Sequence, residues 1–173
     1  MKNLIVLIAF FMAATTFSMA QKIVYVDTDK VLNSMPDYKE AQQQIDKITE
    51  KWQKEIQSKY SEIEEMYKAY QAEEILLTDD LKQRRQNEII EKEKALKDTQ
   101  KAKFGHEGAL FKKRQELVKP IQDEIYAAIQ KMATQSAYDF VLDKSSGVSI
   151  LFANEKYDKT AEIMRSLGIG GDE

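Results

Sequence analysis

The sequence has no cysteine, and its 173 residues include only two prolines, six glycines and one histidine. Without cysteine the chain has no disulfide, no thiolate metal site and no cysteine nucleophile. The single histidine, His106, cannot form a histidine-rich metal site, and the sequence has no glycine-rich loop of the kind that binds nucleotide phosphates. We therefore expect no metal, no cofactor and no enzymatic activity.

Charged residues are abundant, at 32% of the chain against about 25% in an average protein. Lys and Arg number 26 and Asp and Glu number 29, which gives a net charge of −3. Many Lys, Glu and Gln residues with few glycines predict long helices. The acidic balance, and the lack of aromatic residues among the basic ones, argue against a nucleic-acid partner.

Residues 1–20 have the pattern of a secretory signal peptide. Lys2 precedes an apolar run from Leu4 to Phe17, and Ser18 and Ala20 are the small residues expected before a cleavage site. The run is shorter than the roughly 20 apolar residues of a membrane span, which favours cleavage over a membrane anchor. We expect an exported chain that begins at Gln21.

The remaining sequence predicts a mainly α-helical protein with a small β body, an α+β fold. A strand is expected at 22–27, helical turns at 28–35 and a helix from Pro36 to about Leu77, with Ser34 and Asp37 as its capping box. Thr78 is expected to cap a second helix, 79–136, kinked at Pro120. Two strands of a hairpin, 138–143 and 148–153, and a helix over 158–167 follow. The expected organisation is a signal peptide (1–20), the first part of the β body (21–35), a helical arm with its tip near 77–80 (36–119), the rest of the body (120–168) and a flexible tail (169–173).

Both long helices have apolar residues along one face. In the first helix their mean spacing is about 3.6 residues, as in a straight helix, and in the second they recur every seven residues, as in a coiled coil. The helices also have opposite charge: 36–79 has six basic and eleven acidic residues, and 80–119 has twelve and seven. We predict an antiparallel helical hairpin, with two solvated helices that do not pair as the alternative. The apolar positions are Ala41, Ile45, Ile48, Trp52, Ile56, Tyr60, Ile63, Tyr67 and Tyr70, then Phe104, Phe111, Val118, Ile125 and Met132.

The short strands predict an oligomer. Returning helices bring strands from the two ends of the chain together, but such a small sheet cannot bury a sufficient core by itself. We therefore expect sister copies to share the base in a closed homo-oligomer. The interface candidates are Val24, Val26, Phe140, Leu142, Ile150 and Phe152.

The order of these segments resembles the Skp (OmpH-like) family of periplasmic chaperones. The similarity rests on 22–27 (KIVYVD), the long charged helices, 138–143 (YDFVLD), 149–154 (SILFAN) and 157–164 (YDKTAEIM). The resemblance implies a jellyfish-shaped homotrimer in the periplasm, whose tentacles hold unfolded outer-membrane β-barrel proteins without ATP. It also allows transient contact with a membrane surface. Well-studied members of the family are strongly basic, whereas this chain is slightly acidic.

A chaperone of this kind needs many weak contacts, which scattered aromatic residues and methionine supply. For each tyrosine the alternative to client binding is packing between the two helices. The three consecutive apolar residues at 75–77, by contrast, cannot all face the contact between the helices. A structural or adaptor coiled coil of the cell envelope is the alternative function. The client-binding candidates are Tyr60, Met66, Tyr67, Tyr70, Ile75, Leu76, Leu77 and Phe104.

Gly105 and Gly108 are unusual inside an expected helix, because each glycine there costs about 1 kcal/mol relative to alanine. One interpretation is a hinge, together with Pro120, that lets the arms spread around clients of different size. The other is close packing of the helices, or tolerance of glycine on an exposed surface. The sequence does not decide between them.

Overall fold

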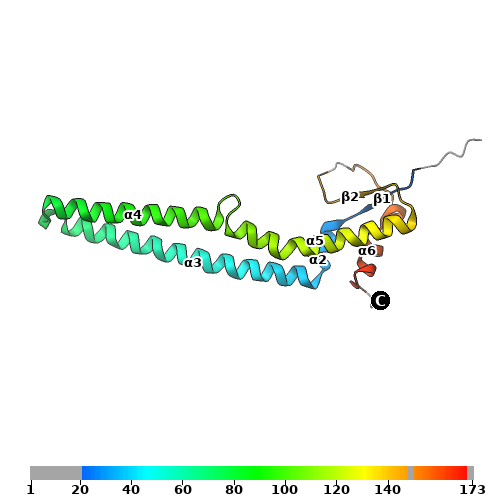
Figure 1. Ribbon diagram of the computed structural model, residues 1–173, viewed down its shortest axis with the longest axis horizontal. Coiled ribbons are helices and arrows are strands. Elements are labelled where there is room, and N and C mark those ends of the chain that lie inside the picture. Colours follow the sequence, from blue (N-terminus) through cyan, green and yellow to red (C-terminus); the bar gives the residue numbers. More distant parts are fainter. Residues whose placement is uncertain (1–20, 148–149, 171–173) are drawn as a thin grey trace, which may run out of the picture.

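The computed structural model describes residues 21–147 and 150–170, and it is strongly elongated (Figure 1). A long helical arm extends from a small body that contains the strands and the last helix. The expected signal peptide lies outside the described residues. In chain order the elements are β1 (Ile23–Val26), α2 (Thr28–Ser34), α3 (Pro36–Glu73), the 3-10 turn η1 (Glu74–Leu76), α4 (Asp79–Phe104), α5 (Ala109–Ser136), β2 (Phe140–Asp143), the 3-10 turn η2 (Glu155–Tyr157) and α6 (Thr160–Ser166).

The arm is the predicted antiparallel hairpin: α3 leads away from the body, and α4 and α5 return along it (Figure 1). Pro36 begins α3, where its missing N–H costs nothing. The expected capping box is wrong, because Met35 is the N-cap residue and the Ser34 hydroxyl donates to the Lys30 carbonyl (2.7 Å). Thr78 caps α4 as predicted, since its Oγ1 accepts from the Leu81 N–H (3.4 Å).

The prediction of one continuous helix over 79–136 is wrong, because residues 105–108 form a loop between α4 and α5. A Cβ at Gly105 would overlap the carbonyl oxygen of Lys101, and one at Gly108 would lie 2.9 Å from the carbonyl oxygen of Gly105. The loop also contains Glu107 with a φ of 58°. The two glycines therefore permit a tight backbone turn. Pro120, in contrast, does not end the helix, because α5 continues through it.

The described residues form a two-stranded parallel sheet in which Ile23 is opposite Phe140 and Val26 is opposite Asp143. The arm thus connects two neighbouring strands. The expected strand at 148–153 is wrong for residues 150–153, which are not in a strand; 148 and 149 lie outside the described residues. β1 has β2 on one side and a bridge between Tyr25 and Asp158 on the other, whereas no described strand pairs with the outer edge of β2.

Apolar side chains form two separate cores. The body core joins β1, α2, α6 and the base of the arm, and Ile169, expected in the flexible tail, packs against it. The distal core lies between α3 and α4 and has only four buried residues, with Ile56, Met66 and Leu77 partly buried beside them. The body core comprises Val24, Val26, Val31, Met35, Ala41, Ile121, Ile125, Met132 and Ile163, and the distal core comprises Ile63, Tyr70, Ile89 and Leu96.

Candidate functional site

The two helices of the arm are joined by polar contacts as well as by the distal core. Lys92 Nζ lies 2.8 Å from Glu62 Oε1 across the arm, and its hydrogen bond holds the pKa of Glu62 below the ordinary value. The Tyr70 hydroxyl accepts from Gln86 Nε2 (2.7 Å). These contacts agree with the opposite charges of the two helices and set α3 and α4 side by side.

The aromatic candidates on α3 divide into exposed and packed residues. Tyr60 and Tyr67 are 58% and 50% exposed, so they lie on the surface beside the seam. Tyr70 is 8% exposed and belongs to the distal core, and Met66 is partly buried against that core. Tyr60 and Tyr67 therefore have free surface for a partner, whereas Tyr70 mainly holds the arm together.

The tip of the arm presents apolar side chains to solvent. Ile75 and Leu76 in η1 are 92% and 85% exposed, whereas Leu77 packs partly against the distal core. Two of the three consecutive residues are therefore exposed, as expected for a run that cannot all face one seam. Leu81 and Ile90 on α4 are also exposed, at 44% and 59%, although neither is among the predicted client-binding residues.

Phe104 lies beside the loop at 105–108, far from the tip. Its ring packs edge-to-face against Trp52, with 6.0 Å between the ring centroids, and it stays 37% exposed. Lys103 lies over the same Trp52 ring, 5.4 Å from its centroid, and forms an ion pair with Glu55. The hydrogen bond from Lys103 lowers the pKa of Glu55. The hinge candidates Gly105 and Gly108 thus adjoin a cluster that joins α3 to α4.

The structure divides the interface candidates of the body. Val24 and Val26 are 4% and 0% exposed and fill the body core, so their side chains cannot meet a sister copy as we expected. Phe140 and Leu142 on β2 are exposed, and Phe152 is 84% exposed. Leu151, which is not among the predicted interface residues, is 99% exposed. Side chains alternate between the two faces of a strand. A strand at 148–153 therefore predicts that Ile150 and Phe152 share the interface face and that Leu151 lies on the other face.

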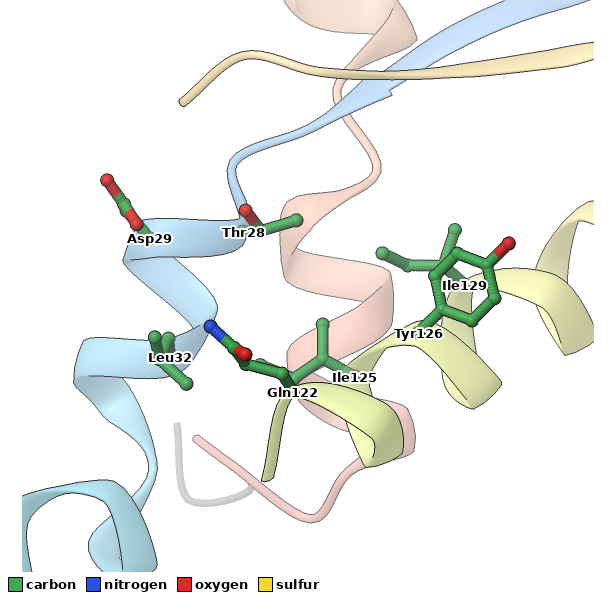
Figure 2. A pocket seen from close by; sticks show the side chains of 7 residues that line it. All are labelled: Thr28, Asp29, Leu32, Gln122, Ile125, Tyr126 and Ile129. Atoms are coloured by element: carbon green, nitrogen blue, oxygen red, sulfur yellow. The ribbon is translucent and has the colours of Figure 1, made fainter. Parts of the chain in front are cut away.

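Two hollows adjoin the body. One, of about 660 Å³, lies beside the sheet and includes Tyr25, Leu142, Ile150 and Phe152 in its lining. The other, of about 220 Å³, lies between α2 and α5, and Figure 2 shows its lining side chains. Among the described residues no group of three or more His, Asp or Glu side chains could hold a metal. The lining of both hollows is mainly apolar, with Asp29 and Gln122 at the smaller one and Lys22 and Asn154 at the larger one.

A polar cluster fixes the end of β2 to the start of α2. The Thr28 hydroxyl donates to Asp143 Oδ2 (2.7 Å), and the Ser145 N–H and hydroxyl donate to Oδ1 (3.0 and 2.8 Å). Burial by itself raises the pKa of Asp143, but these hydrogen bonds outweigh it and hold the pKa below the ordinary value. The carboxylate thus serves as a structural acceptor that sets the position of the loop after β2.

A protein family and a solved structure are similar to this chain. Among the residues described, no helix combines the length and the apolar character needed to cross a bilayer. A comparison with curated protein sequences finds no match. A solved structure of a candidate outer membrane chaperone (OmpH-like) from Caulobacter crescentus CB15 has a TM-score of 0.69 and 14% sequence identity, and the similarity covers 89% of this chain and 88% of that one. The model of the family described as "Outer membrane protein (OmpH-like)" matches residues 22–167. Since this match spans most of the sequence, the chain belongs to the OmpH-like family.

Proposed function

We propose that this protein is an ATP-independent, non-enzymatic chaperone of the periplasm that holds unfolded outer-membrane β-barrel proteins and prevents their aggregation. Membership of the OmpH-like family over residues 22–167 is the observation that carries the proposal. The similarity in fold to a candidate outer membrane chaperone agrees with it. The apolar signal-like segment at 1–20 supports export.

The arm has the surface that such a function needs. Large apolar side chains, among them Tyr60, Tyr67, Ile75 and Leu76, are exposed along a helical hairpin that is otherwise charged. Each can make a weak contact with an unfolded chain, and several together retain it through their high effective concentration. Because every single contact is weak, the client can leave without the hydrolysis of ATP.

We also propose that the functional form is a homotrimer assembled through the body. Phe140, Leu142, Leu151 and Phe152 are exposed beside a two-stranded sheet, and a stable sheet needs more strands or a covered face. Sister copies would cover these side chains and leave the arms free around a shared cavity. Transient contact of the arms with a membrane surface is compatible with this arrangement.

Dilution of an unfolded outer-membrane barrel protein into buffer, with and without this protein, tests the proposal. We expect lower light scattering in its presence, together with a soluble complex whose mass equals one client plus a trimer. The adaptor alternative predicts undiminished scattering and a fixed partner instead. Undiminished scattering at a molar excess of trimer would overturn the chaperone proposal.

A further inference from the structure

One face of the arm contains a groove between α3 and α4, with a volume of about 510 Å³. Ile63 and Leu96, which are 8% and 7% exposed, form its floor. Tyr60 and Ile90, which are 58% and 59% exposed, are its apolar walls. We call this site the arm groove; its lining residues are Tyr60, Ile63, Ile90, Glu93, Lys94, Leu96, Lys97 and Gln100.

Tyr67 adds exposed apolar surface on the groove side of the arm. Tyr67 lies seven residues after Tyr60, two helical turns further along nearly the same face of α3, and it is 50% exposed. A second hollow between the helices, of about 270 Å³, includes Glu65, Glu73 and Arg85 in its lining. Both linings contain three charged residues, but the second hollow has only about half the volume of the arm groove, so a large apolar side chain has more room in the arm groove.

The charge at the rim of the arm groove indicates what else the ligand contains. Lys94 and Lys97 are exposed, and within the described ranges neither forms an ion pair with an acidic side chain. Lys92, by contrast, already binds Glu62. Glu93 is the single acidic residue of the lining. Two ammonium groups beside an apolar wall favour a ligand with a carboxylate next to its apolar part.

We propose that the arm groove binds segments of unfolded polypeptide in which a large apolar side chain stands next to an acidic one. The apolar side chain occupies the space between Tyr60 and Ile90, and the carboxylate lies near Lys94 and Lys97. A closed cavity of roughly 150 Å³ accommodates a benzene ring, so the arm groove has room for an aromatic side chain. This inference rests on the proposed chaperone function and specifies which face of the arm meets the client.

Binding of labelled peptides to the purified protein tests the inference. Three unstructured twelve-residue peptides are compared by fluorescence anisotropy at low salt: one with Phe–Asp pairs, one with Phe–Asn pairs and one with Ala–Asp pairs. We expect the Phe–Asp peptide to bind up to about fivefold more tightly than the Phe–Asn peptide, since an exposed ion pair contributes up to about 1 kcal/mol. It should also bind more tightly than the Ala–Asp peptide, which lacks the large apolar side chain. Equal affinity for Phe–Asp and Phe–Asn peptides would overturn the inference.

Three variants locate the site. Ile90→Ser removes an apolar wall and is expected to weaken Phe–Asp binding by about threefold to tenfold. Lys94→Gln combined with Lys97→Gln is expected to weaken the Phe–Asp peptide and to leave the Phe–Asn peptide unchanged. Leu81→Ser is the control, because Leu81 is another partly exposed aliphatic side chain of α4 (44% exposed, against 59% for Ile90) and lies outside the lining of the arm groove. An equal loss in the control would refute the arm groove as the site.

Circular dichroism melts of all variants show whether the arm stays folded, which we expect because Ile90, Leu81 and both lysines are exposed. The aggregation assay separates this inference from the proposed function. Suppressed scattering without selectivity among the peptides overturns the arm groove and leaves the chaperone function standing. Selective peptide binding without suppression of scattering supports the arm groove and refutes the chaperone function.

Discussion

Ile89 and Ile90 are neighbours on α4 with opposite environments, and replacing each with alanine tests the importance of the distal core. Ile89 is 4% exposed and belongs to that core, whereas Ile90 is 59% exposed at the arm groove. The two substitutions remove the same atoms from the same helix and have the same effect on helix propensity. A difference in stability between them therefore measures packing alone.

The magnitude follows from the atoms removed. Isoleucine to alanine deletes three carbon groups, and each contributes about 0.8 kcal/mol when buried. The cavity left at Ile89 adds to this loss, so we expect Ile89→Ala to cost about 3 kcal/mol, within the usual range of about 2–5 kcal/mol. Ile90 keeps more than half of its surface in water, and Ile90→Ala is expected to cost less than about 1 kcal/mol.

Hydrogen exchange followed by mass spectrometry gives the location of the effect. Because the distal core and the body core are separate, Ile89→Ala should speed exchange in α4 and the facing part of α3 and leave β1 and α6 protected. Ile90→Ala should change neither region. Equal losses from the two variants would refute the assigned packing, and loss of protection throughout the body would refute the separation of the cores.

Three further predictions concern the loop, the body and the interface. Gly105→Ala should lower stability by about 1–3 kcal/mol, because its methyl group overlaps the Lys101 carbonyl, whereas Gly147→Ala, which meets open space, should be neutral in the same thermal melts. Asp143→Asn should cost about 1 kcal/mol at pH 7, after allowance for its partial exposure. Because folding lowers the pKa of Asp143, its contribution is complete above the unfolded value of 3.8 and is lost as pH falls through the folded value, so urea titrations should show the two proteins converging in acid. Phe152→Ser combined with Leu151→Ser should shift the mass in sedimentation equilibrium from trimer toward monomer, and an unchanged mass would refute their place in the interface.

Apolar periodicity predicts the arm well, because long helices depend on local spacing and on their caps. Thr78 caps α4 as expected, and four residues of the predicted apolar stripe, Ala41, Ile45, Ile63 and Tyr70, are buried. The same spacing does not separate Tyr60 from Tyr70, since one is exposed and the other buried. The difference depends on which side of α3 is covered by α4, and the spacing of apolar residues within α3 does not contain that information.

The body is harder to predict because its contacts join distant residues. A run such as 148–153 has the composition of a strand, but composition does not show whether it pairs with the neighbouring strand, and the described residues 150–153 do not pair with β2. The sequence likewise places Val24 and Val26 on a strand without showing that α2 and α6 pack against them, so it predicts an interface where the fold has a core. Gly105 and Gly108 are unusual residues for the interior of an expected helix, but the sequence does not show that the helix is interrupted there. In the structure the backbone turns at these two residues.

The parallel pairing of β1 and β2 makes the whole arm a crossover connection between neighbouring strands. Such a connection needs a minimum of about a dozen residues, and this one is far longer. The sheet register depends on where the arm leaves and rejoins the body, and it is independent of the distance between the body and the tip. Matched insertions or deletions of helical turns in α3 and α4 would therefore lengthen or shorten the reach of the molecule while its base keeps the same geometry.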